Sequence, residues 1–130
     1  MLKVEFYTPN GFYKDIEVNH INVITNDGQR GITENHMSIV SPLEISKLEA
    51  VTDKNIEYFA IGKGLMYFEN KVAKIIVESI EDKNSIDIDR AMKAKERAMD
   101  RLNSNKSSVD IKRAQAALTK ALNRIDVYNS

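Results

Sequence analysis

The spacing of apolar residues changes once along this chain, and that change constrains the fold more than any other feature. Over residues 2–77 apolar and polar residues alternate, which is typical of half-buried strands. From residue 86 onward apolar residues recur every third or fourth position, as they do in amphipathic helices. The polar stretch 81–85 separates the two patterns and is predicted to be a hinge. We therefore expect two parts, at 1–84 and 85–130.

The first part is divided by turn residues into many short strand-like segments. Turn signals stand at 9–11, 26–28, 41–42, 52–55, 62–64 and 69–70, and the strand-like segments between them include 38–40, 43–48, 56–61, 65–68 and 72–77. Helices would need uninterrupted runs of about ten residues, and the turns leave little room for them. Short strands at close spacing favour an antiparallel β-sandwich or barrel.

The second part is predicted to form two helices joined as an antiparallel hairpin. Ser85 or Asp87 can cap the first helix, and Ser107 opens the second after a break at 103–107. The apolar faces consist mainly of alanine: Ile88, Ala91, Ala94, Ala98 and Leu102 in the first helix, and Ile111, Ala114, Ala117, Leu118, Ala121, Leu122 and Ile125 in the second. Such faces bury little apolar area, so their packing should be weak and easily changed. A compact hairpin is expected for the isolated chain, because an extended one would leave the apolar faces wet.

Composition excludes several classes of function. The chain has 19 Lys+Arg and 19 Asp+Glu, and a net charge near zero argues against general nucleic-acid binding. It has no cysteine and only His20 and His36, so no metal centre is expected. The apolar runs are far too short to span a membrane, and no signal peptide is expected because alternation begins at Leu2. No nucleophile and base stand out, so we expect no catalytic site.

Basic residues follow the predicted alanine faces at helical spacing. They are Arg90, Arg97 and Arg101 on the first helix and Arg113, Lys120 and Arg124 on the second. In an antiparallel hairpin these rows could converge and bind a triphosphate, while Asp87 accepts hydrogen bonds from a ribose or an adenine amino group. No Gly-rich phosphate loop is present in the sequence, which favours nucleotide binding without hydrolysis. The alternative is that the rows are solvated or paired with Glu96, Asp100 or Asp110.

An ordered set of motifs along the whole chain resembles the epsilon subunit of bacterial F-type ATP synthase. In the first part the resemblance rests on residues 27–36, Ser41-Pro42-Leu43, Gly64 and Asn70-Lys71-Val72. In the second part it rests on Ile86-Asp87-x-x-Arg90-Ala91, Lys95-Glu96-Arg97-Ala98, Arg101-Leu102, Lys112-Arg113-Ala114, Ala117-Leu118 and Asn123-Arg124.

The resemblance implies a β-sandwich followed by a movable helical hairpin in a non-catalytic regulatory subunit. The sandwich would bind the gamma subunit and rest on the c-subunit ring. The hairpin would move between a compact state and an extended state that reaches the alpha/beta catalytic head and inhibits ATP hydrolysis. The chain would then lie peripherally at the cytoplasmic face of the bacterial membrane. No cofactor is required, and ATP is a regulatory ligand in some members.

The resemblance also implies site residues. The ATP motif is matched by Ile86, Asp87, Arg90 and Ala91, with Glu81, Arg97, Lys120 and Arg124 in support. Lys120 stands where ATP-binding members tend to carry arginine, and a lysine keeps the charge but loses the bidentate fork.

A loop at 27–31 would face the c ring through Asp27, Gly28, Gln29 and Arg30, with His36 nearby. His36 either contacts the ring or fixes the loop. The competing hypothesis for the whole chain is a stand-alone ligand-binding or scaffold module with a helical tail.

Overall fold

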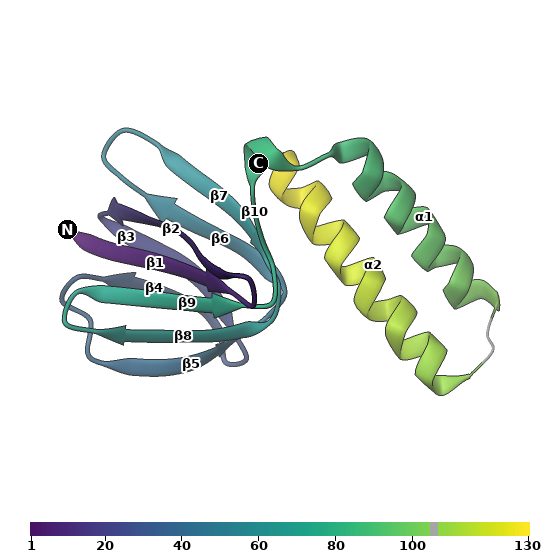
Figure 1. Cartoon of the computed structure of the whole chain (residues 1–130), viewed down its shortest axis with the longest axis horizontal. Helices are drawn as coiled ribbons and strands as arrows, with labels where there is room; N and C mark the ends of the chain where they lie inside the picture. The colour runs from purple at the N-terminus through teal and green to yellow at the C-terminus, as the bar shows by residue number, and fades with distance from the viewer. Residues whose placement is uncertain (105–106) are drawn as a thin grey trace.

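The computed structural model describes residues 1–104 and 107–130 and shows a curled sheet beside a helical hairpin (Figure 1). Within the described residues the strands are β1 (Leu2–Thr8), β2 (Gly11–Val18), β3 (His20–Thr25), β4 (Gly28–Thr33), β5 (Ile39–Leu43), β6 (Ser46–Val51), β7 (Ile56–Ile61), β8 (Gly64–Glu69), β9 (Val72–Val77) and β10 (Ile80–Asp82). A 3₁₀ turn, η1 (Lys83–Ser85), leads into the helices α1 (Ile88–Ser104) and α2 (Ser108–Tyr128). The predicted fold class, a sandwich followed by a hairpin, is confirmed.

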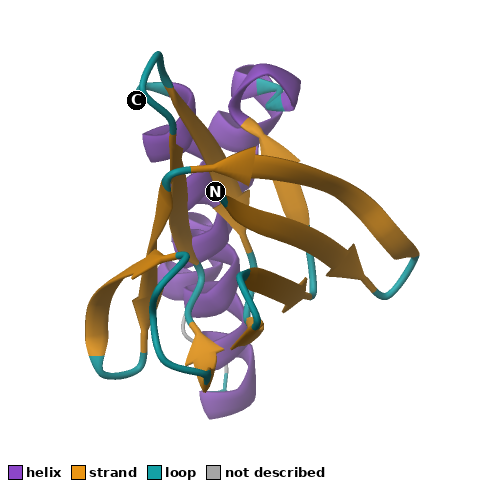
Figure 2. Cartoon of the chain, turned by 90° about the vertical axis from the view of Figure 1, so that its left-hand side faces the viewer, coloured by secondary structure: helices purple, strands orange, loops and turns teal. Residues whose placement is uncertain are grey.

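The strands form one strongly curled sheet in the order β10-β7-β6-β3-β5-β8-β9-β1-β2, with β4 added to β3. The curl folds the sheet over onto itself (Figure 2). Pairing between the described strands is antiparallel except for β1 with β9, which run parallel. The order leaves β10 and β2 at the two edges of the sheet.

The core lies inside the curl and is built from alternate residues of the strands. In β1 the side chains of Leu2, Val4 and Phe6 are fully buried while their neighbours are partly exposed, as the predicted period of two requires. Phe6 packs against Phe59 of β7 with ring centroids 4.9 Å apart. This contact joins strands from distant parts of the sheet order.

The two helices begin at capped residues and pack through alanine. The Arg90 N–H donates to Oδ1 of Asp87 at 3.1 Å, and the Asp110 N–H donates to Oγ of Ser107 at 3.2 Å. Four alanines are buried along the hairpin, namely Ala91, Ala98, Ala114 and Ala121. Small side chains let the helix backbones approach closely, but each contributes little buried area.

The predicted loop at 27–31 is wrong in extent, because residues 28–31 belong to strand β4. The turn between β3 and β4 needs only Asn26 and Asp27, since Thr25 already pairs with Gly28. Gly28 has a φ of +112°, which closes the turn at once and lets pairing resume. The polar residues Gln29 and Arg30 therefore stand on a strand.

The predicted break at 41–42 and the predicted strand at 43–48 are also wrong. Pro42 lies within β5, and the chain breaks afterwards, between Leu43 and Ser46. The Glu44 N–H donates to the carbonyl of Ile24 on β3. Backbone groups two residues apart face the same side of a strand, so the nitrogen of Pro42 also faces β3. Because β5 pairs with β3 only at Leu43, the missing N–H of Pro42 is tolerated.

The predicted hinge at 81–85 contains the last strand and the 3₁₀ turn. Glu81 and Asp82 pair with Ala60 and Phe59 of β7, and the chain leaves the sheet at Lys83. The predicted boundary between the two parts falls inside η1.

Candidate functional site

The hairpin rests on the sandwich through α2, which lies between the strands and α1 (Figure 1). A small apolar cluster forms the centre of this contact. Val127 near the end of α2 is fully buried against Ile86 and Ala60, with Tyr58 packed beside them. A cluster of this size stabilises the docked hairpin only modestly.

Polar contacts surround the cluster. The amide Nδ2 of Asn123 donates to the carbonyl of Ser46 at 2.8 Å. Lys47 lies 3.6 Å from the carboxylate of Asp126 and donates to Oγ of Ser130 at 3.1 Å. These contacts tie the last turns of α2 to β6.

A partly buried ion pair joins α2 to β10. Nη2 of Arg124 donates to Oε2 of Glu81 at 3.1 Å. Nε of the same guanidinium lies 2.6 Å from Oε1, without the alignment of a hydrogen bond. The two side chains are 22% and 34% exposed, so water screens the pair in part.

This ion pair lines a cavity of about 230 Å³ between α2 and the sandwich. Lys120 lines the same cavity, one helical turn before Arg124. The structure therefore brings together three of the predicted ATP-binding residues: Glu81, Lys120 and Arg124. The two cations at this cavity can bind an anion if the carboxylate of Glu81 releases the guanidinium of Arg124.

The other predicted ATP-binding residues lie at the start of α1 and along it. Ile86 packs under Val127, and Ala91 is fully buried. Asp87 is engaged as the cap of α1, and Arg90 and Arg97 are exposed without an ion pair among the described residues. The motif thus holds the start of α1 in place and leaves two arginines accessible.

The predicted basic rows do not converge at one place. Arg101 and Arg113 line a separate cavity of about 270 Å³ at the far end of the hairpin, together with Ser104 and Asp110. Antiparallel pairing places this end away from Lys120 and Arg124. The predicted pairing of the basic rows with Glu96, Asp100 or Asp110 is not seen, since none of these acids forms an ion pair among the described residues.

The residues predicted to face the c ring are spread along β4 and the loop after it. Thr25 ties the turn together, because its hydroxyl accepts from the Asp27 N–H at 3.1 Å and donates to the Gly28 carbonyl at 3.0 Å. Gln29 and Arg30 follow on β4. His36 follows the strand, in the connection that leads to β5, and its contact with the c ring stays a prediction.

His36 has structural partners. Its Nδ1 lies 2.7 Å from the carbonyl of Met37, and its ring meets the ring of Phe68 edge-on with centroids 6.0 Å apart. The structure thus gives His36 a place in packing the loop between β4 and β5.

Several docking residues had no signal in the sequence. Ser46, Lys47, Tyr58 and Asp126 are common residue types in no motif, and Asn123 was noted only as part of the family resemblance. Only the meeting of β6, β7 and α2 gives them a role. The helical period of α2 identifies its apolar face, but it does not show which of the polar residues of the helix contact the sandwich.

Of the helices that the structure describes, neither is long and apolar enough to cross a membrane. Across residues 1–104 and 107–130, no three histidine, cysteine, aspartate or glutamate side chains gather so as to hold a metal ion.

Both parts of the chain match one family. Residues 1–83 match the beta-sandwich domain of the ATP synthase delta/epsilon chain, and residues 84–129 match its long alpha-helix domain. The chain belongs to the ATP synthase delta/epsilon family. The two family domains meet between residues 83 and 84, inside η1.

Curated relatives agree with this assignment. The ATP synthase epsilon chain of Lactobacillus helveticus is 39% identical over 106 residues, covering 78% of this chain and 73% of the relative. That of Alkaliphilus oremlandii is 37% identical over 103 residues, covering 79% and 77%. These bacterial relatives confirm the predicted resemblance, and they leave the stand-alone module without support.

Solved structures share the fold. A chain of the Euglena gracilis mitochondrial ATP synthase, solved as OSCP/F1/c-ring, superposes with a TM-score of 0.77 at 24% identity, covering 89% of this chain and 74% of that one. A chain of the Tetrahymena thermophila mitochondrial ATP synthase central stalk and c ring gives 0.67 at 13% identity, covering 98% and 96%. At these identities the likeness is one of fold.

Proposed function

We propose that this chain is the central-stalk epsilon subunit of a bacterial F-type ATP synthase and has no catalytic role of its own. The sandwich binds the gamma subunit and rests on the c ring, at the cytoplasmic face of the membrane. The hairpin regulates ATP hydrolysis by moving between the docked arrangement and an extended one that reaches the alpha/beta head. Family membership over both parts of the chain supports the assembly.

The small contact between α2 and the sandwich carries the regulatory half of the proposal. One fully buried valine and one largely buried isoleucine contribute about 1.5–3 kcal/mol each at most. The hydrogen bonds around them add about 1 kcal/mol apiece, and ordering the contact side chains opposes both. The net docking free energy is therefore a few kcal/mol, and about 1.4 kcal/mol changes the population ratio tenfold. A ligand with a modest preference for the docked state can shift such a balance.

We further propose that this ligand is ATP, bound by the docked hairpin without hydrolysis. The motif Ile86-Asp87-x-x-Arg90-Ala91 and the supporting Arg97 supply one side of the site. The other side is the cavity of Glu81, Lys120 and Arg124. Glu81 holds the Arg124 guanidinium, so a phosphate group must share or displace that carboxylate.

Calorimetric titration of the purified chain with ATP tests this proposal, with and without magnesium and with GTP as a control. We expect saturable one-to-one binding that prefers ATP. Arg90→Ala should weaken it at least tenfold, because a charge-assisted contact contributes about 1.5–3 kcal/mol. Lys112→Ala removes one exposed cation at the opposite end of the hairpin and should leave binding unchanged. Equal affinities in the two variants would refute the site.

Lys120→Arg sharpens the test. Arginine restores the bidentate fork at the cavity, so we expect tighter ATP binding in this variant.

The assembly has its own test: the tagged chain should co-purify with gamma, alpha and beta subunits from bacterial membranes. Absence of these subunits would refute the central-stalk assignment, whatever the titration shows.

A further inference from the structure

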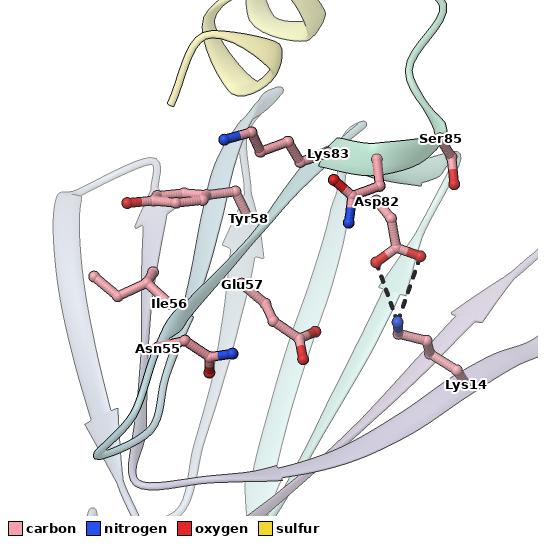
Figure 3. A pocket seen from close by; sticks show the side chains of 9 residues that line it. Lys14, Asn55, Ile56, Glu57, Tyr58, Asp82, Lys83 and Ser85 are labelled. Carbon is pink, nitrogen blue, oxygen red and sulfur yellow. Dashed lines mark hydrogen bonds and ion pairs between the residues drawn. The ribbon is translucent and has the colours of Figure 1, made fainter.

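The curled sheet does not close on itself. Its two edges face each other across a cavity of about 520 Å³. Lys14 of β2 lines one side, residues 55–58 line the other, and residues 82–85 line the end nearest the hairpin (Figure 3). This open seam is larger than the cavity beside Arg124.

Backbone groups of β7 face the seam without a strand opposite them. The Gly62 N–H donates to the carbonyl of Ser79, so even-numbered residues of β7 direct their N–H and C=O groups toward the β10 side. However, β10 pairs only with Phe59–Ile61, because the chain leaves the sheet at Lys83. Among the described residues no strand pairs with Ile56 or Tyr58 on that side.

Among the described residues, the side-chain contacts that bridge the seam lie at its hairpin end. The Tyr13 hydroxyl donates to Oδ2 of Asp82 at 2.8 Å, and Lys14 donates to Oδ1 of the same carboxylate at 3.1 Å. Lys14 also lies 5.2 Å from the ring centroid of Phe59. These contacts hold the two edges together and leave the stretch along Ile56 open (Figure 3).

Two lysines and two acids line the seam, so its formal charges balance. Lys14 pairs with Asp82, and the ammonium of Lys83 donates to the carbonyl of Ser130. Glu57 forms no ion pair among the described residues, and its carboxylate is directed into the seam (Figure 3). A basic side chain would complement it.

We propose that the seam is a docking site for an extended polypeptide segment of a partner chain. The segment adds to the free edge of β7 as a strand and places a lysine or arginine opposite Glu57. Free strand edges bind extended peptides through main-chain hydrogen bonds, while side-chain pockets select the sequence. The docked segment also contacts residues 82–85, so it steadies the connection between the sandwich and the hairpin. The inference rests on the proposed function in one respect: the partner is sought in the assembled ATP synthase.

Hydrogen exchange tests the inference on the full chain, alone and in the assembled enzyme. Assembly should slow exchange of the Ile56 and Tyr58 amides about tenfold or more, as a newly formed hydrogen bond does. The Glu57 N–H faces β6, where Glu57 pairs with Ala50, and serves as the internal control with unchanged exchange. Unchanged exchange at Ile56 and Tyr58 in an assembled enzyme would overturn the seam proposal alone. Failure to assemble would overturn the proposed function as well.

A proline variant distinguishes a segment that pairs with β7 as a strand from one that only shields the seam from water. Ile56→Pro removes the N–H that faces the seam and no hydrogen bond to β6, so the isolated chain should fold. Ile56→Val keeps the N–H and is the matched control. We expect the proline variant to lose the added protection at Tyr58 on assembly and the valine variant to keep it. Full protection of Tyr58 in Ile56→Pro would overturn the proposal, and the wild-type exchange decides it if that variant fails to fold.

Discussion

Docking of the hairpin should depend on Val127 more than on any other side chain of α2. This valine has no exposed surface and contacts Ile86 and Ala60 across the interface. Val127→Ala deletes two buried methyl groups at about 0.8 kcal/mol each, or about 1.6 kcal/mol. The undocked population should therefore rise roughly fifteenfold, while the core of the sandwich keeps its packing.

Relaxation-dispersion NMR on the backbone amides of Ala60 and Ile86 measures that minor population. Val109→Ala provides the matched control, because Val109 is 56% exposed in the first turn of α2 and the deleted atoms are the same. Equal undocked populations in the two variants would show that burial of Val127 does not hold the hairpin in place. The polar contacts of Asn123, Asp126 and Arg124 would then hold the hairpin by themselves.

Two further predictions concern the sandwich. Gly64→Ala should lower the urea midpoint strongly, since a Cβ there would lie 2.0 Å from the Ile76 carbonyl oxygen and overpacking costs about 1–3 kcal/mol or more. Gly28→Ala meets no atom within 4 Å and should cost only the strain of its positive φ. Burial and the hydrogen bond to Asp82 raise the pKa of Tyr13 from 10.0 to about 12. Because the neutral phenol is favoured in the folded state, this stabilisation is complete below pH 10 and is lost as pH rises through about 12. Unfolding measured against pH should show that loss in wild type, and Tyr13→Phe should abolish it.

The helices were predictable because their determinants are local. Asp87 and Ser107 cap α1 and α2 through hydrogen bonds to residues three positions on. Ala91 and Ala114 fall on the buried faces that the helical period assigns to them. Interactions between near neighbours in sequence can be read from a short window.

The strands were less predictable, because pairing overrides local signals. Pro42 resembles a strand breaker, yet it lies within β5 where β3 is scarcely paired. The glycine-containing stretch 28–31 resembles a loop, yet pairing with β3 makes it a strand. Both differences arise from strand pairing. At Pro42, β5 is scarcely paired with β3, and the turn after β3 brings residues 28–31 back to pair with that strand.

The candidate site divides in the same way. Sequence motifs identified Arg90, Glu81 and Arg124 as one ATP-related set, and the structure places Glu81 and Arg124 in contact across 43 residues. It also separates Arg113 from Lys120 by placing them at different cavities. Helical spacing predicted that the cations converge at one place, which is only partly right. Lys120 and Arg124 line the cavity beside the sandwich, whereas Arg101 and Arg113 line the cavity at the hairpin tip.

By itself, the sequence determined the two-part architecture, the helix caps, the alanine faces and the family. These follow from apolar period, local hydrogen bonds and ordered motifs. Tertiary structure alone decided that Glu81 turns toward α2 while Asp82 turns toward β2. Adjacent residues of one strand point to opposite sides, so a single polar stretch of sequence supports both the docked hairpin and the open seam.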